Sequence, residues 1–318
     1  MRLFYYQTAA PSANFGDELN PWLWPRLLPA FDGSSKNVFI GMGTVLNDAI
    51  PSWVNEAENA IFFSTGVGYG RSFRFIKQPL HWRLYCVRGP LSARKLNQPQ
   101  SLAITDGAAL LKRFFRPVPY AERQYKFSYM PHFRHGSLSL LKGICHRTGV
   151  HYIDPGGNVA DVIAAISHTQ VLISEAMHGA IVADTLRVPW IPVRTNPRIL
   201  PFKWRDWCAS VKVPYQPQII RGVSALSWRE GAQSVRSYLQ GQSSAFDLLS
   251  DLRMNDFSLG FERPKTPEAA LAALDAQMIE VTRKTPYLSS EPHLESLVVR
   301  LEDRLDALKK DISRGLFS

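Results

Sequence analysis

The sequence predicts an α/β protein with two Rossmann-like domains and a helical C-terminal extension. Between residues 1 and 225, short apolar runs alternate with Gly- or Pro-marked turns and with helical segments, which is the pattern of strand-helix-strand units. Beyond that point the pattern is helical. With 318 residues, 45% of them hydrophobic, the chain can fill the cores of two such domains. We place the domain bounds at residues 1–120 and 121–225, with the extension at 226–318.

Five short strands are predicted in the first domain. They fall at residues 3–6, 38–40, 61–63, 84–87 and 102–104. Helices are expected between them at residues 16–28 and 90–96. The basic, proline-containing stretch at residues 112–119 is typical of a domain connection.

The second domain is expected to begin with a strand at residues 125–130. A helix at 138–147, a strand at 151–153 and a helix at 159–167 follow it. Asn158 ends a strong turn signal and is placed to cap the helix that comes next. Two consecutive units of this kind make the cleft between them the default position of an active site.

Two helices are predicted in the C-terminal extension. Thr266-Pro267-Glu268 is a helix start, with a capping hydroxyl and a proline in the first turn, and leads into residues 269–284. The last segment carries a stripe of apolar residues at spacings of four and three: Leu294, Val298, Leu301, Leu305, Leu308 and Ile312. So short a stripe favours packing against the protein's own body, and a homodimer is the alternative.

The charge balance predicts an anionic partner. There are 37 basic and 27 acidic residues, which give a net charge of +10. Nucleic acid, an anionic membrane surface and a phosphorylated small molecule all meet this requirement. Because the basic residues are dispersed and no recognition motif is present, we do not expect a nucleic-acid-binding protein.

Cysteine usage and hydropathy predict a cytoplasmic protein. Cys86, Cys145 and Cys208 lie far apart and form no CxxC pair, which argues against a disulfide framework and a structural zinc site. The apolar opening is too short for the core of a signal peptide, and no later apolar run approaches transmembrane length. We therefore expect neither export by a visible signal nor a membrane span.

His178 is the leading candidate for proton transfer. It lies in a polar turn between a buried strand that ends near Ser174 and a short helix, and a second strand follows at residues 188–193. The turn therefore falls at the carboxyl end of a strand, where α/β proteins bind ligands. A neutral imidazole there can exchange a proton near neutral pH, while N–H groups at the start of the helix hold an anion. A capping or core histidine is the alternative.

Seven motifs, in their order and spacing, resemble one protein family. They are Asn14-Phe15-Gly16-Asp17-Glu18-Leu19-Asn20-Pro21, Gly41-Met42-Gly43-Thr44, Gly66-Val67-Gly68, Val87-Arg88-Gly89-Pro90-Leu91-Ser92, Thr105-Asp106-Gly107-Ala108-Ala109-Leu110-Leu111, Met130-Pro131-His132, and the block at residues 174–189. Over roughly residues 1–220 the chain resembles the polysaccharide pyruvyl transferase family.

The resemblance implies an enzyme that moves a pyruvyl group from phosphoenolpyruvate to a pair of sugar hydroxyls, forming a cyclic ketal and releasing phosphate. The implied acceptor is a bacterial exopolysaccharide or its lipid-linked oligosaccharide precursor. No metal and no other cofactor is required, since phosphoenolpyruvate is the donor substrate. The family fold is similar to the GT-B glycosyltransferases, with the acceptor on the side of residues 1–120 and the donor on that of 121–225. Such acceptors imply a cytoplasmic enzyme at the inner face of the plasma membrane, with peripheral membrane contact.

One position departs from the family's histidine motif, which often reads Ser-x-Arg-Leu-His. Ala176 and Met177 replace the arginine and leucine, while His178 matches the catalytic histidine. The missing arginine helps to hold phosphoenolpyruvate, so other basic side chains must supply part of that charge. The candidates each follow a predicted strand: Arg88, Arg134 and Arg194. A salt-bridged arginine at a helix start is the alternative for Arg88.

Carboxylates beside the motifs are further candidates. Asp17 can bind acceptor hydroxyls or act as a base, and a helix N-cap is the alternative. Asp106 can likewise serve only as a cap. Glu175 can contact substrate or orient the imidazole of His178, although adjacent residues on a turn usually diverge.

His132 and Lys203 complete the predicted site. His132 is expected to bind an anion or transfer a proton; it forms an HxxH pair with His135, but no third ligand at the usual spacing supports a metal site. Lys203 opens Lys203-Trp204-Arg205-Asp206-Trp207, which suits phosphate binding or stacking on a sugar, with an amphipathic helix as the alternative. A GT-B-type nucleotide-sugar glycosyltransferase remains the alternative enzyme.

Overall fold

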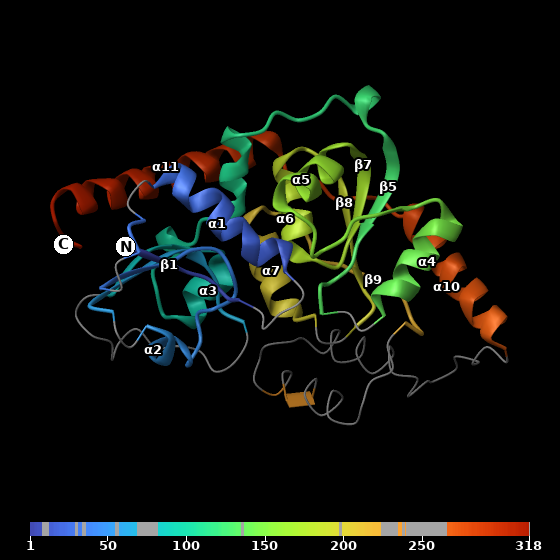
Figure 1. Cartoon of the computed structure of the whole chain (residues 1–318), viewed down its shortest axis with the longest axis horizontal. Coiled ribbons are helices and arrows are strands. Elements are labelled where there is room, and N and C mark those ends of the chain that lie inside the picture. Colours follow the sequence, from blue (N-terminus) through green and yellow to red (C-terminus); the bar gives the residue numbers. More distant parts are fainter. Residues whose placement is uncertain are drawn as a thin grey trace. The chain divides into compact units, whose positions relative to one another are not determined.

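The structure is a computed structural model that describes residues 1–7, 13–28, 31–33, 36–54, 57–68, 82–134, 137–196, 199–223, 235–236, 239 and 266–317. It confirms the α/β class, with two parallel sheets and helices around them (Figure 1). The described residues form two compact units. The first unit comprises Met1–Arg116, Lys203–Pro214 and Ser289–Ser318, and the second comprises Pro117–Phe202 and Tyr215–Leu288.

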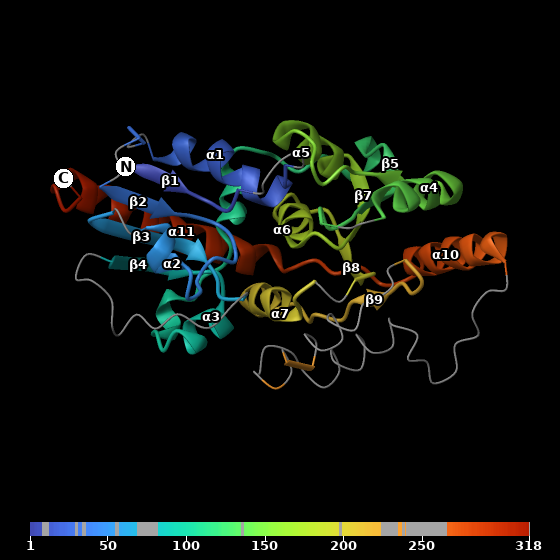
Figure 2. The ribbon, with the colours of Figure 1, turned by 60° about the horizontal axis from the view of Figure 1, so that its bottom comes forward.

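The sheet of the first unit has four parallel strands in the order of the chain (Figure 2). They are β1 (Arg2–Phe4), β2 (Asn37–Ile40), β3 (Asn59–Thr65) and β4 (Trp82–Val87). Every residue of β2 is buried, as expected for a parallel strand covered on both faces. Helices α1 (Phe15–Leu27), α2 (Ile50–Trp53) and α3 (Pro90–Lys95) follow β1, β2 and β4.

The strand predicted at residues 102–104 is wrong. Gln100–Leu102 forms the short 3-10 helix η2, and only Ala103 makes a β-bridge, to Val87. A second 3-10 helix, η3 (Gly107–Arg113), begins after Asp106, whose side chain accepts a hydrogen bond from the Ala108 N–H. Asp106 is therefore a helix cap. This is the structural role that the sequence offered as the alternative to a functional one.

The sheet of the second unit has five parallel strands in the order β6-β5-β7-β8-β9. They are β5 (Tyr125–Met130), β6 (His151–Tyr152), β7 (Thr169–Ser174), β8 (Trp190–Arg194) and β9 (Gln218–Ile219). The chain adds β6 on one side of β5 and then returns to add β7 on the other side. The direction of strand addition therefore reverses between β5 and β7, and ligands of open α/β sheets bind at the carboxyl ends of strands at such a point.

Four helices of the second unit agree closely with the predicted ones: α4 (Leu138–Thr148), α5 (Val159–Ser167), α6 (Met177–Thr185) and α10 (Pro267–Thr282). The short 3-10 helix η4 (Tyr120–Glu122) was not predicted. Asn158 and Thr266 cap α5 and α10 through their side chains, as predicted. The core of the unit joins Tyr129, Ile173 and Ile191 of the sheet to side chains of α4 and α10.

The chain leaves the second unit twice to rejoin the first. Most of α7 (Pro201–Ser210) belongs to the returning segment Lys203–Pro214, whereas the predicted bounds of the second domain, 121–225, include this segment. The last helix, α11 (Glu291–Ser313), also belongs to the first unit, whereas α10 belongs to the second. The predicted extension is thus divided between the two units.

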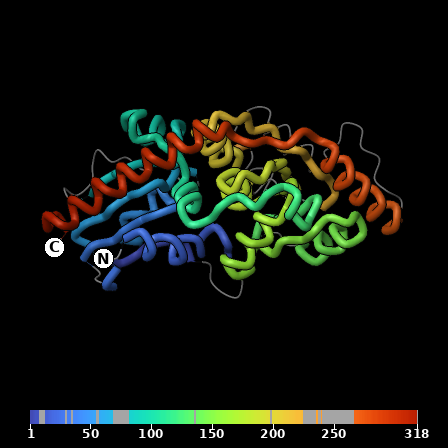
Figure 3. The backbone as a smooth tube through the Cα atoms, turned by 90° about the horizontal axis from the view of Figure 1, so that it is seen from above, coloured from blue at the N-terminus to red at the C-terminus, as the bar shows by residue number. Residues whose placement is uncertain are grey.

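Helix α11 buries its apolar stripe within the first unit, where it contacts β4 and η3. Figure 3 shows its course along this unit, in red. The buried side chains are Leu294, Leu297, Val298, Leu301, Leu305 and Leu308. At its margin, Arg113 binds the carboxylates of Glu295 and Glu302. The stripe packs against the protein's own body, as the sequence favoured.

Candidate functional site

Glu175 lies at the strand reversal of the second unit and joins three strand ends. It follows β7, and its own N–H donates to the Met130 carbonyl at the end of β5 (3.0 Å). Its carboxylate accepts from the His132 N–H through Oε2 (3.2 Å) and from the Thr195 N–H through Oε1 (2.6 Å). The side chain is fully buried. Glu175 therefore uses both carboxylate oxygens on backbone donors of the protein.

Tyr129 lies in the core close to Glu175. Burial, followed by the negative charge of Glu175, raises the pKa of the Tyr129 hydroxyl well above its ordinary value. The phenol consequently stays protonated at every pH at which the enzyme is expected to work. The hydroxyl near the Glu175 carboxylate, that of Tyr129, is therefore neutral.

His178 is the second residue of α6, the helix that follows β7 and Glu175. The N-cap residue of α6 is Ala176, which makes no side-chain cap hydrogen bond, while the Ser174 hydroxyl donates to the Ala176 carbonyl (2.8 Å). Gly179 allows the helix to approach β5 and β7, because a Cβ there would lie 2.7 Å from both the Met130 Sδ and the Ser174 Oγ. The half-buried His178 therefore lies at the start of a helix, as predicted.

His132 and Arg134 follow β5 at the same end of the sheet. The His132 Nδ1 accepts from the Arg134 N–H (3.3 Å), so the proton of a neutral imidazole is on Nε2. The exposed Arg134 guanidinium lies 5.2 Å from the centre of the Phe133 ring. His132 can therefore present an N–H donor to an anion.

Arg194 is the last residue of β8 and is fully buried. It directly precedes Thr195, which donates to Glu175. The structure thus brings Glu175, His132, Arg134, Arg194 and His178 to the ends of three neighbouring strands. Binding of substrate by these residues remains a prediction.

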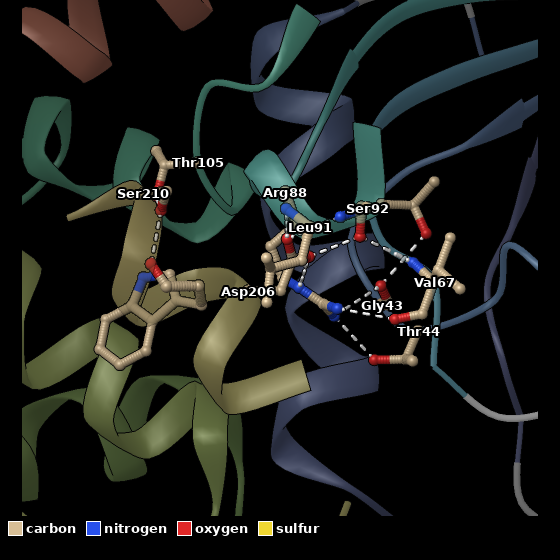
Figure 4. A network of polar contacts seen from close by, with 11 residues as sticks. Gly43, Thr44, Val67, Arg88, Leu91, Ser92, Thr105, Asp206 and Ser210 are labelled. Atoms are coloured by element: carbon tan, nitrogen blue, oxygen red, sulfur yellow. Dashed lines mark hydrogen bonds and ion pairs between the residues drawn. The ribbon is translucent and has the colours of Figure 1, made fainter. Parts of the chain in front are cut away.

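Arg88, in the first unit, forms a buried ion pair with Asp206 of α7 (Nε to Oδ2, 3.1 Å; Figure 4). Its other guanidinium nitrogens donate to the Thr44 hydroxyl (2.8 Å) and the Val67 carbonyl (2.9 Å). The salt-bridged arginine that the sequence left as an alternative is therefore present, and substrate binding by Arg88 stays a prediction. Asp206 has no local sequence signal for this role, because it lies 118 positions from Arg88.

Asp17 lies in the first turn of α1 and is not its N-cap. Asn14 occupies the N-cap position and accepts from the Gly16 N–H, while its side-chain amide donates to the Asp17 carboxylate (2.7 Å). The alternative that Asp17 is the N-cap residue is therefore wrong, because the N-cap residue lies three positions earlier, at Asn14. A role of its partly exposed carboxylate toward the acceptor is untested.

Lys203 begins the segment of α7 that belongs to the first unit, and it is buried. Trp204 and Trp207 are buried too, so this segment is a helix packed on the unit and its indoles are not available to stack on a sugar. Among the described residues, no group of three or more His, Cys, Asp or Glu side chains could hold a metal ion; His135 lies outside them. Nor does any helix of the described ranges have the length and apolarity to span a membrane.

Two comparisons with known proteins bear on function. A family model described as polysaccharide pyruvyl transferase matches residues 4–197. The succinoglycan biosynthesis protein ExoV of Rhizobium meliloti (strain 1021) is 31% identical over 322 residues, covering 98% of this chain and 99% of the relative. The family match spans the strand ends that carry Arg88, His132, Glu175, His178 and Arg194, and it ends before α7. The chain therefore belongs to the polysaccharide pyruvyl transferase family and is a pyruvyl transferase enzyme.

Proposed function

We propose that the enzyme transfers the pyruvyl group of phosphoenolpyruvate to two hydroxyls of one sugar in an exopolysaccharide or its lipid-linked precursor. The observation that carries this proposal is His178 at the strand reversal of the second unit, in a chain of this family. The name of the relative ExoV, a succinoglycan biosynthesis protein, supports an exopolysaccharide acceptor.

The reaction needs one proton transfer to carbon and the departure of one phosphate. A proton adds to the methylene carbon of phosphoenolpyruvate, and one sugar hydroxyl forms a bond to the neighbouring carbon. The bond from that carbon to the phosphate oxygen then breaks, and a second hydroxyl closes the ketal ring. The two hydroxyl protons balance the proton gained by the new methyl group and the one carried away by phosphate.

His178 is suited to the proton transfers. An imidazole has an ordinary pKa of about 6.5, so it can give and take a proton near neutral pH. The start of α6 adds backbone dipoles that favour a negative charge beside it. We assign His178 to protonation of the carbon or of the leaving phosphate.

The carboxylate and phosphate of the donor require cationic and N–H partners. His132 can donate through Nε2, and the guanidinium groups of Arg134 and Arg194 supply positive charge at the same strand ends. These groups supply the positive charge that the family's motif arginine would provide at the position of Ala176. No metal or further cofactor enters this scheme.

A phosphate-release assay tests the proposal. Incubation with phosphoenolpyruvate and a succinoglycan-type oligosaccharide should release phosphate and add a pyruvate ketal, detected by mass spectrometry. In a thermal-shift comparison, phosphoenolpyruvate should stabilise the protein and UDP-, GDP- and ADP-sugars should not. Stabilisation by a nucleotide sugar alone would favour a glycosyltransferase and contradict the proposal.

A lipid-linked acceptor would place the enzyme at the inner face of the plasma membrane through peripheral contact. The net charge of +10 favours attraction to anionic lipid. Sedimentation with vesicles that contain anionic lipid, lost at high salt, is the expected result. Equal sedimentation with neutral vesicles would argue against this attraction.

A further inference from the structure

Asp206 connects a segment outside the family match to a polar network of the first unit in which Arg88, Ser92 and Asp206 are fully buried (Figure 4). We propose that Asp206 is a positioning residue that, through Arg88, fixes the loop residues 43–46 after β2 and 66–68 after β3, and thereby the acceptor site. The effect on the acceptor rests on the proposed function. The effect on the loops does not depend on it.

The Asp206 carboxylate binds four donors. Oδ1 accepts from the N–H groups of Leu91 and Ser92, both at 2.9 Å, and Oδ2 accepts from the Arg88 Nε and the Ser92 hydroxyl. The N-cap residue of α3 is Gly89, which has no side chain for capping. Asp206 therefore supplies the cap of α3 from α7, a helix more than 100 residues away in sequence.

Arg88 extends this network to two strand ends. One guanidinium nitrogen donates to the Thr44 hydroxyl after β2, and another donates to the Val67 carbonyl after β3. The Val67 N–H in turn donates to the Ser92 hydroxyl (3.0 Å). Loops at the carboxyl ends of parallel strands are the part of such a unit that meets substrate.

The surrounding glycines make room for both side chains. A Cβ at Gly89 would overlap Asp206, and a Cβ at Gly66 would overlap the Arg88 guanidinium. These glycines belong to the motifs that carry the family resemblance. The space that the ion pair requires therefore accounts for glycine at these two positions.

Both side chains of the pair are fully buried. Because neither side chain reaches solvent, the pair can affect substrate only by positioning the loop residues that it contacts, such as Thr44 and Val67. Removing one partner of a buried pair leaves the other charge uncompensated, so the loops should shift rather than simply lose a contact. Asp206 is therefore a positioning residue and not a catalytic residue.

The variant Asp206→Asn tests the proposal, because it keeps the shape and turns an acceptor into a donor that faces other donors. We expect faster hydrogen exchange at residues 43–46 and 66–68 in a protein that still folds. For the acceptor, kcat/KM should fall by about 10- to 100-fold, with the KM of phosphoenolpyruvate unchanged. Gly89→Ala, which displaces Asp206 while keeping every charge, should give the same pattern.

Asp275→Asn is the matched control, since it breaks the Arg147–Asp275 ion pair, which lies nearer the surface in the second unit. It should change neither the exchange of these loops nor the kinetics. The proposal is overturned if folded Asp206→Asn keeps wild-type exchange in both loops, or if it raises the KM of phosphoenolpyruvate as much as the KM of the acceptor. If the wild-type enzyme transfers no pyruvyl group, the proposed function fails, while the exchange measurement still decides whether Asp206 holds the loops.

Discussion

The Glu175 carboxylate and the Thr195 N–H lie 2.6 Å apart in a fully buried hydrogen bond between the end of β7 and the residue after β8. Because the other carboxylate oxygen holds the His132 N–H, one side chain sets the spacing of three strand ends. Hydrogen bonds of N–H groups to carboxylates are stronger than neutral ones. The backbone around His132 and His178 is therefore fixed before substrate arrives.

We expect Glu175→Gln to lower kcat by about 10- to 100-fold, because its amide nitrogen would face a backbone donor and displace one strand end. An unsatisfied buried donor should also reduce the free energy of unfolding by about 1–3 kcal/mol. Steady-state kinetics and denaturant unfolding measure the two effects. Asp184→Asn is the control: Asp184 is also buried in this unit, but its carboxylate accepts from the Trp190 indole (3.0 Å), which an amide oxygen can replace. Equal loss of activity in both variants would contradict this assignment.

His178→Ala should lower kcat by about 10²- to 10⁴-fold, because it removes the group that transfers the proton. The mutant should still be stabilised by phosphoenolpyruvate in a thermal-shift assay, since the cationic groups remain. His146, exposed on α4, provides the control substitution His146→Ala, which should leave kcat unchanged. Full activity of His178→Ala would remove the catalytic role.

Leu301→Ala should destabilise the protein by about 2–5 kcal/mol, because the Leu301 side chain of α11 is fully buried and its truncation leaves a cavity. Val299 lies two residues earlier on the same helix and is 44% exposed, so Val299→Ala should change stability by less than about 0.5 kcal/mol. Chemical denaturation measures both. A midpoint that rises with protein concentration and is equally sensitive to both variants would instead indicate that α11 forms a dimer.

Two buried thiols predict a loss of stability at high pH. Burial raises the pKa of Cys86 and of Cys145 from the ordinary value of 9.0 to about 12. Between these values the unfolded chain loses thiol protons that the folded protein keeps, so stability is complete below pH 9 and falls as the pH rises toward 12. Each thiol should contribute about 1.4 kcal/mol per pH unit in that interval.

Denaturant unfolding between pH 8 and 10.5 measures this fall. The double variant with Cys86→Ala and Cys145→Ala should show a shallower dependence on pH than the wild type. Buried tyrosines such as Tyr129 add the same background slope to both proteins. Identical slopes would show that the thiols do not titrate differently in the two states.

Local signals predicted most of the elements and the position of His178. Asn158 and Thr266 cap the expected helices, and the turn after Ser174 lies at the carboxyl end of β7, because each of these features depends on a few neighbouring residues. The strand predicted at residues 102–104 is wrong because an apolar triplet suits a strand or a tight helix equally. Their environment, a single bridge to Val87, decided between the two.

The polar contacts could not be predicted in the same way. Nothing near Asp206 indicates that it meets Arg88 and caps α3, because that contact depends on the return of α7 to the first unit. For Glu175, orientation of the His178 imidazole was one candidate role, against the tendency of adjacent turn residues to diverge. Its carboxylate binds backbone donors after β5 and β8 instead, and no local pattern indicated these partners. The register of three parallel strands determines these partners, and register is a property of the whole sheet.

The return of α11 to the first unit has a consequence for synthesis on the ribosome. Met1–Arg116 emerges early, yet its β4 and η3 are covered by a helix that begins at Glu291. Until the last residues leave the exit tunnel, the nascent first unit exposes the apolar surface that α11 will bury. The second unit reaches the end of its own sequence at Leu288 and can close before the first. A nascent chain whose α11 is still inside the exit tunnel, with α10 already outside, should therefore carry a folded second unit and an incomplete first one.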